Sequence, residues 1–310
     1  MIAQEQAAQP KSVVRHITQG PATPLQESIF QCGVQGIQNS RKTATGRITA
    51  TDGTVLTVPA DTAFTAGPKA SDLYNECNGK KPKRLIDISV ADLPIVEVDA
   101  DGEVVTGYVV ADNYFELYIN DKLVAVDPLP YTPFNSAIVR FRVKKPYTYA
   151  LKVVDWEEKL GLGMEWFPPN HDWWTGDGGL IARFSDGVVT DASWKAQTFY
   201  ISPLKSPNDV IERGNVHDTS ALGRFHPQAK QPDCQLRCFA VHYPIPHAWS
   251  SPKFDDRAWP SASEFTDAQV GISPALISYT QFPEAFVGAQ WIWSSNLVFD
   301  NLVLLRKTVH

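Results

Sequence analysis

The segment "NHDWWTGDGG", residues 170–179, gathers residue types that commonly bind ligands. Trp173 and Trp174 lie in it and Trp166 lies just upstream, among glycines and prolines. Exposed indoles stack on the apolar faces of sugar rings, because C–H groups meet the negative face of the π system. Polar neighbours could bind the sugar hydroxyls, namely Asn170, His171, Asp172 and Asp177. The segment therefore predicts a carbohydrate-binding loop.

A structural role competes with this prediction. Large aromatic side chains are buried on average, so at least two of the three tryptophans could instead close the end of a hydrophobic core. The sequence alone leaves both interpretations open.

Histidines raise the possibility of copper or zinc chemistry. His171 precedes Asp172, but no second histidine stands at ligand spacing in that loop. His242 and His247, in "VHYPIPH", form a second candidate pair, which strand alternation places on opposite sides unless the prolines bend the chain. Cys234, Cys238 and His242 have zinc-like spacings of four but no clear fourth ligand.

Carboxylates raise the possibility of glycoside hydrolysis. Asp155, Glu157 and Glu158 would serve it only if two of them faced one sugar at the required separation. The sequence contains no G-x-S-x-G elbow, no H-E-x-x-H and no P-loop. Asp99 and Asp101 in "VDADGEV" lack the later ligands of a calcium loop and predict a turn, as do Asp255 and Asp256 in "FDDRAW".

The elements that must position these residues are strands. Of 310 residues 43% are hydrophobic and 11% aromatic, with 23 prolines, which is typical of a β-rich protein with many fixed turns. Short alternating segments separated by Gly, Pro, Asn or Asp run from about residue 95 to the end, with no long amphipathic helix between them. This pattern predicts an all-β sandwich or jelly roll.

We expect three regions along the chain. Residues 1–27 would form an extended arm, residues 28–84 a small β region and connection, and residues 85–310 the sandwich. Asp52-Gly53 in "GRITATDGTVLTVPA" predicts a hairpin turn, and a helical turn is expected near residues 71–75.

Charge and cysteines bear on partners and location. A formal charge of -6, without a large basic patch, argues against nucleic acid, and no stretch reaches the roughly 18 apolar residues of a membrane span. The Ala/Gln-rich start resembles a mature N-terminus with an added Met, which favours a secreted or periplasmic protein.

Four cysteines allow three disulfide pairings. We favour Cys32 with Cys77 and Cys234 with Cys238, since each pair is isolated from the other. The oligomeric state stays open.

Several segments resemble one known family pattern. "ADNYFELYINDKLV" resembles a hairpin of galactose-binding-like and PA14-like β-sandwiches, with Asn113 and Asp121 where that pattern has Asp and Gly. "GDGGLIARFSDGVVTDASWKA", "PKFDDRAWPSA" and "AQWIWSSNLVFDNLVLLRKTV" resemble accessory domains of α-L-rhamnosidase-type proteins, where the "WIW" strand comes first rather than last. The resemblance spans about residues 110–310 and extends to uncharacterised secreted bacterial proteins of this type.

The resemblance implies a galactose-binding-like jelly-roll sandwich, here with a small N-terminal β region. It also implies calcium at Asp112 and Asn113, with Asp155, Asp172 and Asp177 available from neighbouring loops, because calcium prefers carboxylate, amide and carbonyl oxygens.

The resulting hypothesis is a secreted carbohydrate-binding module with a structural calcium ion. The alternatives are a metal-dependent oxidase or hydrolase, or a carboxylate glycoside hydrolase, on the same sandwich, and a subunit of an extracellular assembly.

Overall fold

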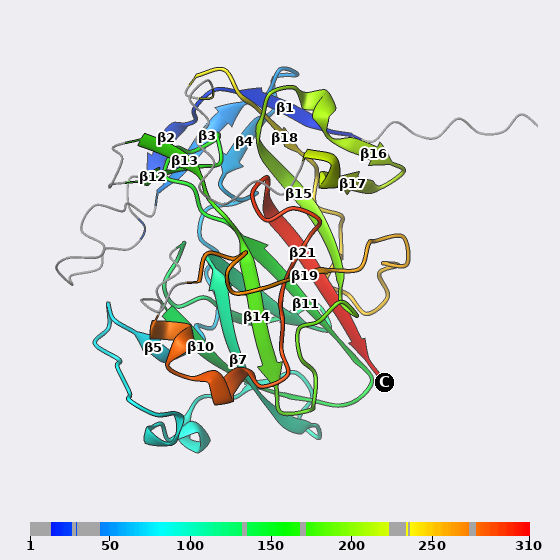
Figure 1. Cartoon of the computed structure of the whole chain (residues 1–310). Coiled ribbons are helices and arrows are strands. Elements are labelled where there is room, and N and C mark those ends of the chain that lie inside the picture. The colour runs from blue at the N-terminus through cyan, green and yellow to red at the C-terminus, as the bar shows by residue number, and fades with distance from the viewer. Residues whose placement is uncertain are drawn as a thin grey trace, which may run out of the picture.

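The computed structural model describes residues 14–26, 29, 44–131, 135–167, 172–222, 234, 236–272 and 277–310. Two seven-stranded sheets, antiparallel apart from one short strand, dominate these residues, and a three-stranded sheet lies at one end of them (Figure 1). The prediction of an all-β fold with a small N-terminal β region is therefore confirmed.

The first large sheet has the strand order β1-β18-β15-β21-β11-β8-β9. Its strands are β1 (His16–Gln19), β18 (Phe239–His242), β15 (Lys195–Leu204), β21 (Asp300–Val309), β11 (Tyr147–Val154), β8 (Tyr114–Ile119) and β9 (Lys122–Val126). β11 is buried along its whole length, and the two polar side chains on one of its faces have partners: Thr148 contacts the hydroxyl of Thr308, and Lys152 pairs with Glu116.

The second large sheet has the order β19-β20-β14-β7-β10-β5. Its strands are β19 (Ser263–Phe265), β20 (Trp291–Trp293), β14 (Gly179–Phe184), β7 (Glu103–Asp112), β10 (Asn135–Val143) and β5 (Ser71–Asn75), while β6 (Val96–Glu97) pairs parallel to β10. One continuous hydrophobic core contains residues of both sheets.

Smaller elements surround the sandwich. The three-stranded sheet consists of β2 (Thr23–Gln26), β3 (Thr45–Thr49) and β4 (Val55–Val58). Two hairpins are formed by β12 (Met164–Phe167) with β13 (Asp172–Thr175), and by β16 (Ile211–Arg213) with β17 (Val216–Asp218). Helical segments are short: α1 (Ile277–Thr280) and the 3₁₀ turns η1 (Leu85–Asp87), η2 (Val90–Asp92), η4 (Pro207–Asp209), η5 (Ser220–Leu222) and η7 (Pro283–Phe286).

The N-terminal region contributes directly to the large sheets. β1, within the expected arm, pairs with β18, and β5, within the expected connection, pairs with β10. The Asp52-Gly53 turn joins β3 to β4, so the predicted hairpin is confirmed. The helical turn expected near residues 71–75 is wrong, because pairing with β10 holds this segment as a strand whatever its local preference.

The described helices bear on one further expectation. None of them is long and apolar enough to span a membrane.

The three-stranded sheet, β1 and the β12–β13 hairpin all gather at one end of the sandwich, and the C-terminus lies at the other (Figure 1).

Candidate functional site

The β12–β13 hairpin is held in place by the segment that precedes it. This segment follows β11, and its buried Glu157 accepts hydrogen bonds from the backbone N–H groups of Gly161 and Gly163. The hydroxyl of Tyr200 donates to the same carboxyl over 2.9 Å. Burial raises the pKa of Glu157 to about 8, against the opposing effect of these donors. A single carboxyl thus joins the approach to the hairpin to strand β15.

The hairpin sets the faces of its aromatic residues. Trp166 lies opposite Trp173 in the register, so their side chains share one face. Their ring centroids are 5.4 Å apart with an interplanar angle of 67°, an edge-to-face arrangement. Both rings are half-buried, and so is Trp174, which pairs with Glu165 on the other face.

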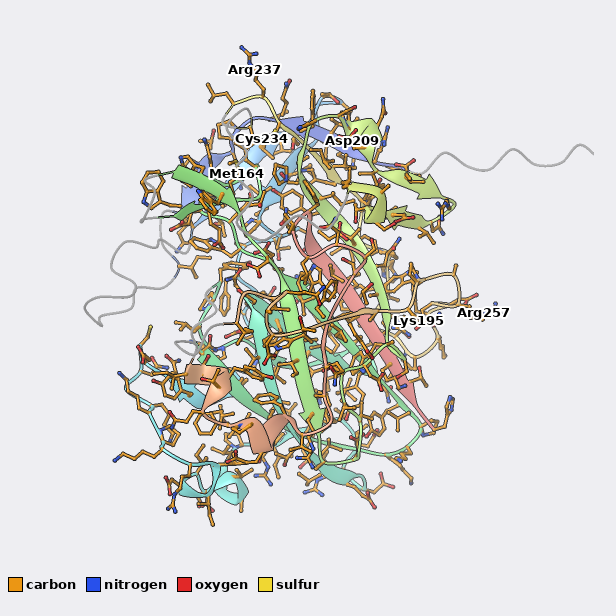
Figure 2. The ribbon with its side chains drawn as sticks, in the orientation of Figure 1. Met164, Lys195, Asp209, Cys234, Arg237 and Arg257 are labelled. Carbon is orange, nitrogen blue, oxygen red and sulfur yellow. A yellow bond between two sulfur atoms is a disulfide. The ribbon has the colours of Figure 1, made fainter. Side chains whose placement is uncertain are left out.

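Trp173 also has a structural contact. It packs against a small cluster of Leu162, Met164 and the Cys234–Cys238 disulfide, separate from the main core. Figure 2 shows Met164 and Cys234 at the same end of the molecule. The Nζ of Lys159 lies 5.0 Å from the centroid of the Trp173 ring, and burial lowers the pKa of this lysine. The core-closing interpretation therefore holds in part for Trp173.

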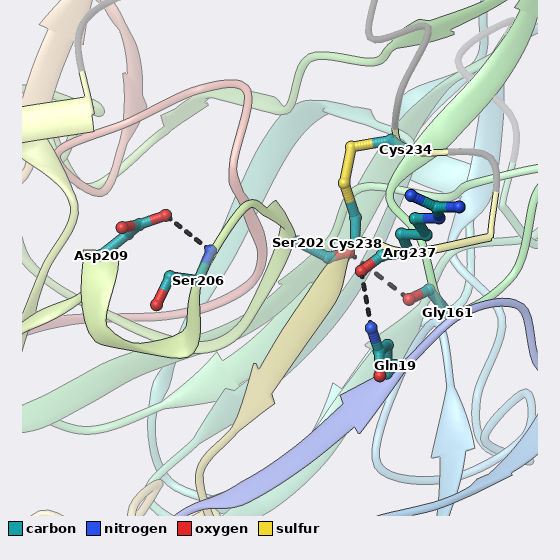
Figure 3. Close-up of a disulfide and its surroundings, with 8 residues drawn as sticks. All are labelled: Gln19, Gly161, Ser202, Ser206, Asp209, Cys234, Arg237 and Cys238. Carbon is teal, nitrogen blue, oxygen red and sulfur yellow. Dashed lines mark hydrogen bonds between the residues drawn. A yellow bond between two sulfur atoms is a disulfide. The ribbon is translucent and has the colours of Figure 1, made fainter.

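The disulfide connects this cluster to β1. Gln19 donates to the carbonyl of Arg237 over 3.0 Å, next to Cys238 (Figure 3). Gly20 donates its N–H to the carbonyl of Cys238 over 3.0 Å. The predicted Cys234–Cys238 pair is confirmed, which removes both sulfurs from any zinc site. Cys77 is also disulfide-bonded, whereas Cys32 lies outside the described residues.

A group of carboxylates lies beside the hairpin, at the end of β11. Asp155 is buried, and its Oδ1 has no hydrogen-bond partner in the described part of the chain. Its pKa is raised well above the usual value, first by burial and then by the negative charges of Glu165, Asp112 and Asp177. Three residues predicted to act together, Asp112, Asp155 and Asp177, are therefore neighbours.

Backbone pairing explains how these residues meet. Asp112 ends β7 opposite Gly179 of β14, so Asp177 precedes that pair by two residues. The N–H of Asp155 donates to the carbonyl of Asn301 over 2.8 Å, near the start of β21. Glu165 reaches the same region from the hairpin. Sequence reasoning missed Glu165, although its place in a strand beside Trp166 could have indicated that it faces away from that ring.

Both polar atoms of the Asn113 side chain, a predicted calcium ligand, are already hydrogen-bonded. Its side-chain amide donates to Asp112 Oδ1 over 2.7 Å, and its Oδ1 accepts from the N–H of Trp156 over 2.6 Å. Within the described residues, no three His, Cys, Asp or Glu side chains are arranged as a metal-ligand set. The calcium site therefore stays a prediction. Asn170 and His171 lie outside the described residues, and Asp172 is placed only as the first residue of β13.

The candidate metal ligands His242 and His247 do not form a pair. His242 is buried in β18, where its Nε2 lies 3.1 Å from Thr18 Oγ1 and its ring stacks on Tyr200 at 4.5 Å. Burial and the nearby His16 lower the pKa of His242 to about 3, so it is neutral. His247 is exposed beyond the end of that strand.

The other candidate carboxylates have local structural partners. Glu158 accepts from the N–H of Trp166 over 2.6 Å, which fixes the start of the hairpin. Asp255 accepts from Arg257, and Asp256 pairs with the buried Arg306 over 2.7 Å. Asp99 accepts the N–H of Gly102 at its backbone carbonyl, so "VDADGEV" is the predicted turn.

Comparison with known proteins adds no family assignment. No protein-family model, no curated protein and no solved structure matches the chain.

Proposed function

We propose that the chain is a secreted or periplasmic carbohydrate-binding module, a jelly-roll sandwich of the galactose-binding-like type. It binds sugar at the β12–β13 hairpin. The observation that carries this proposal is the pair of Trp166 and Trp173, which share one face of a hairpin at the end of the sandwich and remain partly exposed. Two indoles at an angle present an apolar corner, against which the C–H face of a sugar ring gains both burial and stacking.

Carboxylates beside the hairpin support the same function. Glu165, Asp112 and Asp177 each lie close enough to Asp155 for their charges to raise its pKa, in addition to burial. Carboxylate oxygens accept hydrogen bonds only, and sugar hydroxyls supply many donors. Aromatic contact together with several acceptors suits a neutral polyol better than an anion.

Trp166→Ala tests the proposal. Soluble and insoluble polysaccharides are screened first, and affinity for the best ligand is then measured by calorimetry. We expect the substitution to weaken binding by about tenfold or more, because a stacking contact and its buried apolar area are lost together. Trp166 is preferred to Trp173, since the latter also packs on the disulfide cluster.

Ile86→Ala provides the matched control. Ile86 is 81% exposed, so this variant also removes an exposed apolar side chain, but from the η1 turn. Its affinity should equal that of the wild type. A folded Trp166→Ala protein that bound the ligand as tightly as the control would rule out the hairpin as the binding surface.

Calcium accompanies the proposal as a separate measurement. If the ion binds at Asp112, Asp155 and Asp177, adding calcium to chelator-treated protein should raise the free energy of unfolding by about 2.7 kcal/mol at one hundred times Kd. Asp155→Asn should abolish that increase. An unchanged unfolding midpoint in saturating calcium would remove the ion from the proposal and leave the tryptophan surface standing.

A further inference from the structure

A hollow of about 240 Å³ lies between the three-stranded sheet and the β1, β15 and β18 end of the first large sheet. Polar and aromatic side chains line it among apolar neighbours: His16, Thr57, Asp61, Tyr200, His242 and Tyr243. We propose that this hollow is a subsite for a single neutral sugar ring. This inference rests on the proposed carbohydrate-binding function and adds a second contact point to it.

Size limits the ligand first. A hollow of about 240 Å³ is small for a binding site, since pockets for drug-sized ligands span about 300–1,000 Å³. A single pyranose ring with its hydroxyls is a ligand of suitable size, and a longer chain would have to extend out of the hollow.

Charge then excludes anions. Lys152, the partner of the lining residue Asp61, is already paired, with its Nζ 3.1 Å from Asp61 Oδ1 and 2.8 Å from Glu116 Oε1. His242 is buried and neutral, and His16 lies 2.7 Å from a carboxylate oxygen of Asp52. Among the described residues that line the hollow, none offers an uncompensated positive charge. A phosphate or carboxylate ligand would therefore be repelled by Asp61, with no uncompensated positive charge among these residues to attract it.

Hydrogen-bonding groups of both kinds remain for hydroxyls. Asp52 faces Nδ1 of His16, which places the imidazole proton there when the ring is neutral and leaves Nε2 as an acceptor. The carboxylate of Asp61 is 42% exposed and accepts, and the hydroxyl of Thr57 both donates and accepts. Apolar surface also lines the hollow, from residues that include Leu56, Tyr243 and Ile245. A sugar ring has the same two characters, a hydroxyl rim and C–H faces.

The hollow is structurally joined to the tryptophan hairpin. Tyr200 lines the hollow and donates its hydroxyl to Glu157. Glu157 in turn holds Gly161 and Gly163 on the way into β12. Both proposed contact points therefore depend on the same buried connection.

Saturation-transfer NMR with single sugars tests the inference. The probes are D-glucose, D-galactose, D-mannose, L-fucose and L-rhamnose at millimolar concentration, each with the full chain. We expect at least one to bind, and Thr57→Val and Asp61→Asn each to weaken its affinity about fivefold or more. Thr57→Val keeps the shape of the side chain, and Asp61→Asn leaves Lys152 paired with Glu116.

Two further variants separate this site from the hairpin. Asp101→Asn removes an exposed carboxylate that pairs with Lys144, away from the hollow, and should leave monosaccharide binding unchanged. Trp166→Ala should weaken polysaccharide binding while single sugars still bind.

Each other outcome overturns the inference in a distinguishable way. Monosaccharide binding that is lost in Trp166→Ala but kept in Asp61→Asn would place the ring at the hairpin, and the proposed function would survive. Polysaccharide binding without any monosaccharide binding would leave the hollow without a sugar. Binding of neither would end both proposals. Tetramethylammonium binding that depends on Asp61, in the absence of sugar binding, would identify an organic-cation site instead.

Discussion

Glu157 is the residue on which the site depends most directly. Both of its oxygens accept backbone N–H groups, from Gly161 and Gly163, and one also accepts the Tyr200 hydroxyl. Glu157→Gln would turn an amide NH₂ toward one of those N–H groups, whichever way the side chain is rotated. A buried donor would then lack an acceptor, at a cost of about 1–3 kcal/mol. Urea denaturation should show this loss in the free energy of unfolding.

Asp300→Asn is the matched control for that change. Asp300 is equally buried, but it accepts from the hydroxyls of Thr219 and Ser294, at 2.9 and 2.5 Å, and from the backbone N–H of Asn296. An asparagine can turn its amide oxygen toward that one N–H and its NH₂ toward the hydroxyls, which can rotate to accept, whereas a backbone N–H cannot. At pH 6 this variant should therefore lose less stability than Glu157→Gln. Equal losses would show that burial of the carboxyl, rather than donor geometry, controls the segment.

Gly163 gives a second residue-scale prediction. Its φ is +58°, and a Cβ at this position would lie 2.6 Å from the carbonyl oxygen of Ser202. Gly53 also has a positive φ, of +88°, but a Cβ there would meet nothing within 4 Å. Gly53→Ala should cost about 1–2 kcal/mol of unfolding free energy for the left-handed backbone alone. Gly163→Ala should lower the free energy of unfolding by clearly more, and it should shift the Trp fluorescence because β12 must move. Equal losses of stability in the two variants would contradict a close approach of Gly163 to Ser202.

At the scale of elements, the Cys234–Cys238 disulfide supports one side of the hairpin. It forms part of the cluster against which Trp173 packs. Replacing both cysteines by serine should lower the free energy of unfolding by about 2 kcal/mol, near the lower end for native disulfides because the closed loop is short. The fluorescence of Trp173 can be isolated as the difference between the Trp166→Phe protein and the Trp166→Phe/Trp173→Phe protein. Loss of the disulfide should move this emission to longer wavelength. Unchanged emission would mean that Trp173 does not depend on the disulfide.

The strands were predictable from sequence because their signal is local. β10 alternates between apolar and polar residues over much of its length, β21 contains the apolar run Leu302–Leu305, and Asp52-Gly53 specifies its own turn. Pairing partners were not predictable in the same way. His16 lies opposite His242 in the register, and no local pattern indicates that a short N-terminal strand completes the sheet edge there. The same reason explains why residues 71–75 were expected to be helical.

The candidate site was predictable only as a set of residue types. The acidic grouping was anticipated at Asp112, Asp155 and Asp177, since family likeness and loop position both indicated these residues. Glu165 and the hollow near Asp61 were not anticipated, because each depends on a strand pairing with a distant segment. Residue types indicate which chemistry a side chain can perform. Which side chains lie together depends on how the strands pair.

At the scale of the whole molecule, buried carboxyls make stability depend on pH. Burial raises the pKa of Asp127 and of Glu157 to about 8 and that of Asp300 to about 7. A carboxyl whose folded pKa exceeds its unfolded value near 4 binds its proton more tightly in the folded protein. Its stabilisation is complete below the unfolded pKa and is lost as pH rises through the folded pKa. His242 opposes this trend only below about pH 6.5, where its unfolded form takes up a proton.

The free energy of unfolding should therefore fall by about 2–4 kcal/mol between pH 6.5 and pH 8.5, the window in which the buried carboxyls ionise and His242 no longer contributes. Asp127→Asn removes one of these groups and keeps the acceptor for the Leu129 N–H and the Asn135 amide. Urea midpoints measured across the window should drop less in this variant than in the wild type, by about 1–2 kcal/mol, because one fewer proton is released on ionisation. If both proteins lost the same stability, Asp127 would be ionised throughout, and its hydrogen bonds from Leu129 and Asn135 would outweigh the effect of burial.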